Sequence, residues 1–169
     1  RRTKNNREHP HEEENTFNGG SEFRTFDIRT LRMQTQFIEK ILQDQDGYTV
    51  ILTTDVSRSF SRYVTEDDIN GKYLIKNQDN NDSDLESEYA KVKFIFKHDI
   101  LANGNFYVFG ELTDWRISSQ NKMIYNYDDG QYEAWLYLKQ GYYNYEYVFL
   151  QDGSTIPDET IAEGNHFET

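Results

Sequence analysis

The chain has 169 residues, contains no cysteine and carries a formal net charge of -12 at pH 7. A chain of this length can bury a core without covalent staples, and the absence of cysteine excludes disulfides, thiolate metal sites and a cysteine nucleophile. The acidic surplus repels phosphate backbones and anionic lipid, so nucleic acid is not an expected partner. No run approaches the roughly 18 apolar residues of a membrane-spanning helix, so we expect no direct membrane insertion.

Charge is unevenly distributed along the chain. Residues 101–169 hold three basic side chains, eleven acidic ones and both tryptophans. Interfaces bring complementary potentials together, so a ligand or partner of this half is expected to offer apolar, polar or basic surface.

Residues 1–21 are polar and predict a solvated tail or loop. His9 and His11 offer two imidazoles there without a third ligand at a suitable spacing, so a loop is favoured over a metal site. The rest divides into a strand-rich segment at 22–86, which precedes a β-sandwich or packs on it, and the sandwich itself at 87–169.

Residues 22–31 alternate Phe26 and Ile28 with Asp27 and Arg29, which is typical of a strand with one buried face. The pattern predicts that Phe26 and Ile28 point into a core.

The next stretch, residues 34–43, is compatible with a strand or a helix, because its apolar positions fit both spacings. A strand is favoured, because residues 48–53 are rich in β-formers and the Asp-Gly pair at 46–47 is a hairpin signal.

Two loop signals follow. The Asn-Gly pair at 70–71 predicts a hairpin turn into a strand at 72–75. The acidic run 79–86 resembles a calcium loop, but Asp84 stands where the turn glycine belongs and Ala90 where the bidentate glutamate belongs. A solvated acidic linker is therefore favoured.

The clearest alternation begins at residue 89, where apolar residues and lysines take turns, and further strands are expected at 105–110, 131–138 and 144–150. We assign Tyr145, Tyr147 and Phe149 to the core face. We place Val148 and Leu150 beside Trp135 on an outer face. That face is more apolar than water requires, so we expect a neighbouring segment, domain or partner to cover it.

Catalytic groups do not cluster in the sequence. The histidines are scattered, and there is no nucleophile elbow or phosphate-binding glycine loop. The carboxylates that could pair, Asp114 with Asp128 or Asp129, fall in expected turns, where aspartate is common for conformational reasons. We expect no enzymatic activity, no metal and no cofactor.

The aromatic residues of the second half leave two interpretations open. Trp115, Trp135 and nearby tyrosines can form a platform that stacks on sugar rings or anchors a protein partner. The same residues can instead pack within the core and along the strand faces.

The order of these features resembles the glycogen- and starch-binding early-set modules: a strand at 105–110, a loop to Asp-Trp at 114–115, a hairpin through 130–135 and an aromatic strand at 145–147. The resemblance implies an all-β, immunoglobulin-like (early-set) β-sandwich. Glu146 stands where those modules carry a lysine, and Ser154-Thr155 replaces their second tryptophan. A carbohydrate-binding module for α-glucans is therefore the alternative function.

A sharper resemblance is to the type IX secretion system plug protein family of Bacteroidetes. The motifs that carry it lie at 21–27 (Ser-Glu-Phe-Arg-Thr-Phe-Asp), 68–71, 89–94, 106–110, 138–145 (Leu-Lys-Gln-Gly-Tyr-Tyr-Asn-Tyr) and 163–169. The resemblance implies the C-terminal fragment of a larger two-domain β protein.

The same resemblance implies a non-catalytic, periplasmic protein associated with the outer membrane. Such a protein docks on the periplasmic end of the giant outer-membrane β-barrel translocon and seals it. A small-molecule ligand is not expected. The residues expected to contact the partner are Arg24, Arg29, Trp115, Trp135 and Tyr137.

Overall fold

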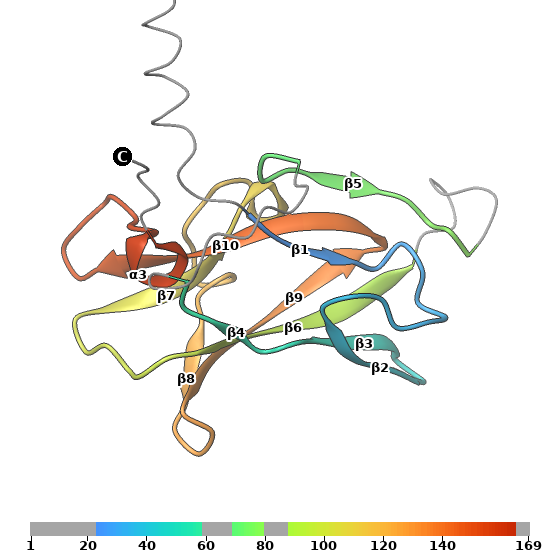
Figure 1. Ribbon diagram of the computed structural model, residues 1–169, viewed down its shortest axis with the longest axis horizontal. Helices are drawn as coiled ribbons and strands as arrows, with labels where there is room; N and C mark the ends of the chain where they lie inside the picture. Colours follow the sequence, from blue (N-terminus) through green and yellow to red (C-terminus); the bar gives the residue numbers. More distant parts are fainter. Residues whose placement is uncertain (1–22, 59–68, 80–87, 165–169) are drawn as a thin grey trace, which may run out of the picture.

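The computed structural model describes residues 23–58, 69–79 and 88–164, which form two β-sheets packed face to face (Figure 1). The all-β sandwich expected from the sequence is confirmed. No helix among the described residues is long and apolar enough to cross a membrane. The residues 1–21, with His9 and His11, lie outside the described ranges.

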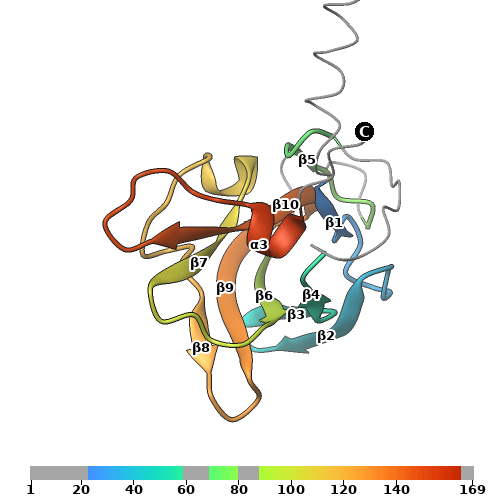
Figure 2. The ribbon, with the colours of Figure 1, turned by 60° about the vertical axis from the view of Figure 1, so that its left-hand side comes forward.

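The first sheet is built around the long strand β10 (Gly141–Gln151). Its first half pairs with β1 (Arg24–Asp27) along one edge and β5 (Tyr73–Ile75) along the other. Its second half pairs with β7 (Gly104–Phe109). The short helix α3 (Thr160–Glu163) packs beside β10 (Figure 2).

The second sheet has β6 and β9 at its centre. Its strands, in spatial order, are β2 (Ile38–Asp44), β3 (Gly47–Leu52), β6 (Tyr89–Lys97), β9 (Gln131–Lys139) and β8 (Ile124–Asn126). The two-residue strand β4 (Asp55–Val56) continues along β6 where β3 ends. The turn of 3-10 helix η1 (Glu111–Thr113) follows β7.

Aromatic side chains from both sheets meet in the core. Phe26 of β1 stacks on Tyr143 and meets the edge of Phe94 from the opposite sheet, and Phe96 stacks on Tyr147. Tyr145, Tyr147 and Phe149 all point inward, as the alternation predicted. Period-2 patterning therefore placed the core face of β10 correctly.

The Asp-Gly hairpin forms as predicted, and the Asn-Gly pair also lies in a turn. β2 and β3 are a hairpin in which Asp44 pairs with Gly47, so residues 34–43 end in a strand and not in a helix. Asn70 and Gly71 both adopt positive φ, the geometry that favours Asn-Gly. The strand that follows, β5, pairs with β10, however, and the residues on the other side of this turn, 59–68, lie outside the described ranges.

The prediction that Val148 and Leu150 share an outer face with Trp135 is wrong. Val148 and Leu150 were placed beside Trp135, but β9 and β10 belong to different sheets, so these residues lie on opposite sides of the molecule. Gln140 lies between β9 and β10, where the chain passes from the second sheet to the first. Its buried side chain accepts a hydrogen bond from the Glu88 N–H and donates to the Arg29 carbonyl oxygen. Val148 is itself buried, whereas Trp135 is exposed on the outer face of the second sheet.

The segment 22–86 contributes strands to both sheets. β1 and β5 flank β10, while β2, β3 and β4 extend the second sheet, so the described parts of 22–86 and 87–169 form one sandwich. Within the expected acidic linker 79–86 only Asp79 is described. Its carboxylate accepts hydrogen bonds from the Thr30 hydroxyl and the Leu31 N–H. Asp79 therefore holds the loop after β1 and is not a solvated linker residue.

Candidate interaction surface

The outer face of the second sheet carries exposed aromatic rings between lysines. We call it the lysine–aromatic face and define it by the lysines and aromatic residues that point outward from the two central strands: Tyr89, Lys91, Lys93 and Lys97 of β6, and Trp135, Tyr137 and Lys139 of β9. Trp135 is 40% exposed and Tyr137 is 68% exposed. An exposed aromatic cluster of this kind marks an interaction site more often than isolated apolar residues do.

The antiparallel register brings the lysines to the rings. Lys93 lies opposite Trp135, and Lys91 lies opposite Tyr137. The Lys91 and Lys93 Nζ atoms are 4.7 and 5.5 Å from the centre of the Trp135 ring. Tyr137 stacks on Tyr89 at 5.2 Å with an interplanar angle of 8°. Two of the rings are therefore held in place by cation–π and stacking contacts before any partner binds.

The charge of this face is opposite to that of the whole chain. The outward positions of β6 and β9 hold four lysines and one carboxylate, Glu133, whose Oε2 atom lies 3.5 Å from Lys93 Nζ. Burial alone would raise the pKa of Glu133, but hydrogen bonds from Gln131 and Asn126 and the Lys93 charge lower it, so Glu133 is ionised. The aromatic residues of β9 thus share this face with lysines of β6, which come from outside the acidic half at residues 101–169.

Trp115 belongs to a different part of the surface. Its ring contacts are edge-on to Phe23 and Phe109, at 6.0 and 5.6 Å between ring centres. It also lies against the Asn-Gly turn, where a Cβ atom added to Gly71 would be 2.3 Å from the ring. The two tryptophans therefore do not form one platform, and Trp115 has a packing role although 44% of it is exposed.

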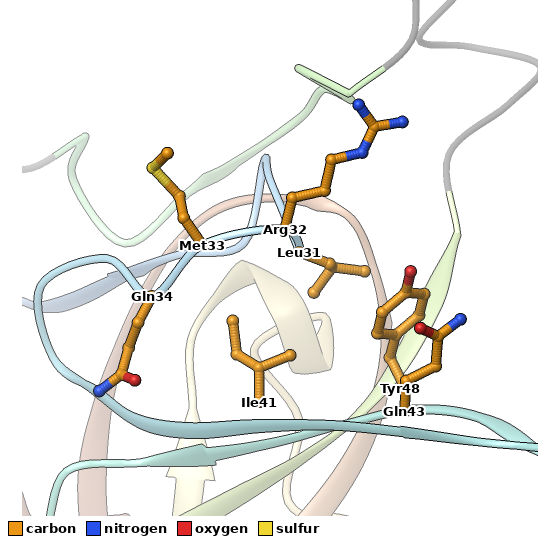
Figure 3. A pocket seen from close by; sticks show the side chains of 7 residues that line it. All are labelled: Leu31, Arg32, Met33, Gln34, Ile41, Gln43 and Tyr48. Atoms are coloured by element: carbon orange, nitrogen blue, oxygen red, sulfur yellow. The ribbon is translucent and has the colours of Figure 1, made fainter.

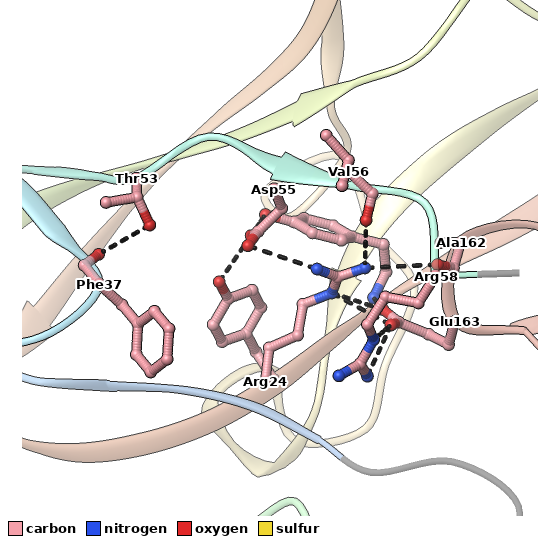
Figure 4. Close-up of polar contacts among 10 residues, drawn as sticks. Arg24, Phe37, Thr53, Asp55, Val56, Arg58, Ala162 and Glu163 are labelled. Atoms are coloured by element: carbon pink, nitrogen blue, oxygen red, sulfur yellow. Dashed lines mark hydrogen bonds and ion pairs between the residues drawn. The ribbon is translucent and has the colours of Figure 1, made fainter. Parts of the chain in front are cut away.

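Arg29 lies in the bend after β1, and the side chain of Arg24 is buried in the molecule. Arg29 forms an ion pair with Asp27 at 2.7 Å and lies over the Tyr142 ring. The Arg24 side chain is 9% exposed and pairs with Glu163 at 3.0 Å and Asp55 at 3.3 Å (Figure 4). The prediction that Arg24 contacts a partner is therefore replaced by a structural role, in which it joins β1, β4 and α3.

The environment of Arg24 is a buried network of charges and hydroxyls. Burial alone would lower the pKa of Arg24, but Glu163 and Asp55 outweigh it and raise that pKa, so the guanidinium stays charged. Asp55 accepts hydrogen bonds from the hydroxyls of Tyr145 and Tyr147, each at 2.6 Å. Burial raises the pKa of Asp55, and Arg24 and both hydroxyls oppose that rise. The network ties α3 to β1, β4 and β10.

Glu163 also accepts a backbone hydrogen bond from β10, beyond the residues of β10 that pair with β1. Its carboxylate accepts a hydrogen bond from the Tyr147 N–H at 2.8 Å, at the edge of β10 that β1 leaves free. It pairs with Arg58 at 2.9 Å as well. A buried carboxylate with three partners satisfies a strand edge and both cations at once, which explains its complete burial.

A groove beside the loop after β1 is a second candidate site (Figure 3). It has a volume of about 460 Å³. Leu31, Ile41 and Tyr48 form an apolar floor, and Arg32 and Gln34 lie at the rim. Arg32 approaches Asp79 at 3.7 Å, but no nucleophile or acid–base pair lines the groove, so it offers no catalytic arrangement.

The carboxylates that could have paired for catalysis are turn residues. Asp114 ends η1 in a left-handed conformation. The N–H groups of Asp128 and Asp129 are capped by the Asn126 side chain in the β8–β9 turn. Within the described ranges no three metal-ligating side chains come together.

The sandwich has a close counterpart among solved structures. A crystal structure of a hypothetical protein from Parabacteroides merdae is similar with a TM-score of 0.84 and 35% sequence identity, over 89% of this chain. The match covers 38% of that protein, so this chain spans well under half of its length. The sequence matches no protein-family model and no curated protein.

Sequence reasoning missed the buried network and the charge of the lysine–aromatic face. A signal for the first was available, because Glu146 interrupts an otherwise aromatic and apolar stretch of β10. Glu146 is buried, and burial together with the nearby Glu159 raises its pKa to about 9. The charge of the face depends on the β6–β9 register, for which the sequence gives no signal.

Proposed function

We propose that this chain is a non-catalytic docking module of the type IX secretion system. In this proposal it lies in the periplasm at the outer membrane and docks on the periplasmic end of the translocon barrel, which it seals. The proposal rests on the motifs shared with the plug protein family. The observation that supports a docking role is the lysine–aromatic face, where Trp135 and Tyr137 are exposed in fixed orientations.

The carbohydrate-binding alternative has less support. Sugar stacking needs an open aromatic face, but two ammonium groups already lie over Trp135. Trp115 packs edge-on against Phe23 and Phe109 over the Asn-Gly turn, and Ser154-Thr155 stands where the sugar-binding modules carry their second tryptophan. A protein partner can use the lysines as well as the rings, and we therefore favour it.

The test is recovery of the barrel from a native membrane extract. The tagged chain is expected to retain a large outer-membrane β-barrel, identified by mass spectrometry, and to lose it when Trp135 and Tyr137 are both changed to serine. A matched variant, Tyr73→Ser with Tyr127→Ser, changes two exposed tyrosines elsewhere and is expected to retain the barrel. An extract that yields no barrel with the unmodified chain contradicts the proposed function.

A further inference from the structure

We propose that the edge of β9 beside Trp135 and Tyr137 binds an acidic, extended segment of a protein partner as an added strand. The proposal rests on the proposed function for the identity of that partner, but its chemistry is argued from the edge itself. Three features of this edge favour such a partner: unpaired backbone groups, an adjoining groove and the lysines of the face.

Half of β9 lacks a neighbour on one edge. β6 pairs with β9 along its whole length, from Gln131 to Lys139. On the other edge β8 pairs only with residues 131–133, the last pair being Ile124 with Glu133. Beyond Glu133 no described strand pairs with this edge.

The unpaired groups can be assigned by the alternation of an antiparallel ladder. The Gln140 N–H donates to the Glu88 carbonyl oxygen at 2.8 Å, so Leu138, Leu136 and Ala134 direct their backbone groups toward β6. Trp135 and Tyr137 consequently direct their N–H and C=O groups to the other edge. No described residue pairs with those groups there, and an extended chain could complete the ladder.

A groove runs along this edge. Four consecutive strand residues, Trp135 to Leu138, line it together with residues of the segment after β7, among them Leu112, Asp114 and Ser118. The groove has a volume of about 470 Å³. Consecutive residues point to alternate faces, so a cavity that touches all four follows the strand edge and not one face of the sheet. The edge is therefore accessible to a polypeptide.

The lysines of the face favour an acidic segment as the added strand. Alternate side chains of an added strand would lie beside Trp135 and Tyr137 on the lysine–aromatic face, near the ammonium groups of Lys91 and Lys93. Glu133 is already engaged with Lys93, which leaves the lysines in excess on this face. Glutamate or aspartate at every second position of the partner would meet these lysines.

A second copy of the chain fits this edge poorly. Two copies joined at β9 by a two-fold axis would bring the lysines of both faces to one continuous surface, and like charges oppose that pairing. An acidic strand from another protein gains the same backbone hydrogen bonds without this repulsion.

The experiment uses the whole chain and a synthetic ten-residue peptide that alternates glutamate with threonine, blocked at both ends. In the free protein, NMR-detected hydrogen exchange is expected to be fast at the Trp135 and Tyr137 amides and slow at Ala134 and Leu136. The peptide is expected to protect Trp135 and Tyr137. A peptide with lysine in place of glutamate, and one N-methylated on the edge that would pair with β9, are expected not to protect them.

Variants test the charge contribution. The double variant Lys91→Gln with Lys93→Gln is expected to lower the affinity for the glutamate peptide about tenfold. This corresponds to about 1.4 kcal/mol for the loss of two partly exposed ion pairs. Lys72→Gln with Lys76→Gln removes the same charge from residues adjoining β5 and is expected to leave affinity unchanged.

Three outcomes overturn the proposal: slow exchange at Trp135 and Tyr137 in the free protein, equal binding of the N-methylated peptide, or binding of the sulfated polysaccharide dextran sulfate but not of the glutamate peptide. Each leaves the proposed function standing if the chain still recovers the translocon barrel. Peptide binding without barrel recovery supports strand addition and contradicts the proposed function, so the two failures are distinguishable.

Discussion

The Lys91 Nζ atom lies 4.7 Å from the centre of the Trp135 ring, a contact between a lysine of β6 and an exposed aromatic residue of β9. At an exposed site such a contact contributes about 0.5–1 kcal/mol. It is too weak to be a main source of stability, but it orients the ring on the open face of the sheet. Residues on this face should therefore affect binding far more than folding.

Trp135→Ala is expected to abolish recovery of the translocon barrel while lowering the free energy of unfolding by about 1 kcal/mol or less. The reason is that the ring is 40% exposed and rests on lysines instead of core residues. Urea denaturation and the pull-down measure the two effects. Tyr127→Ala, at a more exposed aromatic residue in the β8–β9 turn, serves as the control and should change neither. Full barrel recovery by Trp135→Ala would show that the docking surface lies elsewhere.

Gly71→Ala is expected to destabilise the fold by about 2–4 kcal/mol, because it combines strain at positive φ with a steric clash. The added Cβ atom would be 2.3 Å from the Trp115 ring and 2.8 Å from Phe23, at φ +79°. Gly153→Ala is the matched control, since it has φ +84° and no atom within 4 Å of the added Cβ. Its cost should be about 1 kcal/mol, the backbone contribution alone. Equal losses in urea denaturation for the two variants would contradict the packing role of Trp115.

Glu163→Ala is expected to lower the free energy of unfolding by about 3–5 kcal/mol, because it leaves Arg24 and Arg58 without a shared carboxylate. It also removes the acceptor of the Tyr147 N–H at the edge of β10. Glu39→Ala, at an exposed position of β2, should change stability by about 0.5 kcal/mol or less. Thermal and urea denaturation measure the difference. A loss at position 163 as small as at position 39 would mean that the network does not hold α3 to the sandwich.

Stability is expected to fall as the pH rises from about 5 to 9. Burial and the neighbouring Glu159 raise the pKa of Glu146 to about 9, so the folded state keeps a proton that the unfolded chain releases near pH 4.3. This stabilisation is complete below the unfolded pKa and is lost as the pH rises through the folded pKa, with a slope of up to about 1.4 kcal/mol per pH unit.

Glu146→Gln tests that slope, because the amide replaces a protonated carboxyl group. The variant's free energy of unfolding, measured by urea denaturation between pH 5 and 9, is expected to depend less on pH than that of the unmodified chain. The raised pKa of Asp55 has the same sign, so the difference between the two curves, and not the slope of either, reports on Glu146. Parallel curves would mean that Glu146 is ionised in the folded protein.

Much of the fold could be predicted because it depends on local chemistry. The alternation of β6 and β10 gave the correct core faces, and the Asn-Gly pair at 70–71 gave the correct turn, since only a few residues accept positive φ. The pairing of β5 with β10 could not be predicted in this way. It joins strands far apart in the chain, and a three-residue strand carries too little pattern to select its neighbour.

The candidate site was predicted in part. Trp135 and Tyr137 are exposed on one face, as a partner contact requires, while Trp115 and Arg29 lie elsewhere and Arg24 is buried. The sequence alone does not predict which of these side chains are exposed, because the exposure of an arginine depends on which carboxylates the fold brings to it. Asp55 and Glu163 reach Arg24 from β4 and α3, and neither lies near it in the sequence.

The sequence by itself determined an all-β chain with aromatic core faces, because strand periodicity and turn chemistry are set by neighbouring residues. Only the tertiary structure decided the charge of the outer face and the open edge of β9. The register of β6 against β9 places lysines on Trp135 in a chain of net charge -12, and the shortness of β8 leaves the next residues of β9 unpaired. Both follow from contacts between distant segments, which the local pattern does not encode.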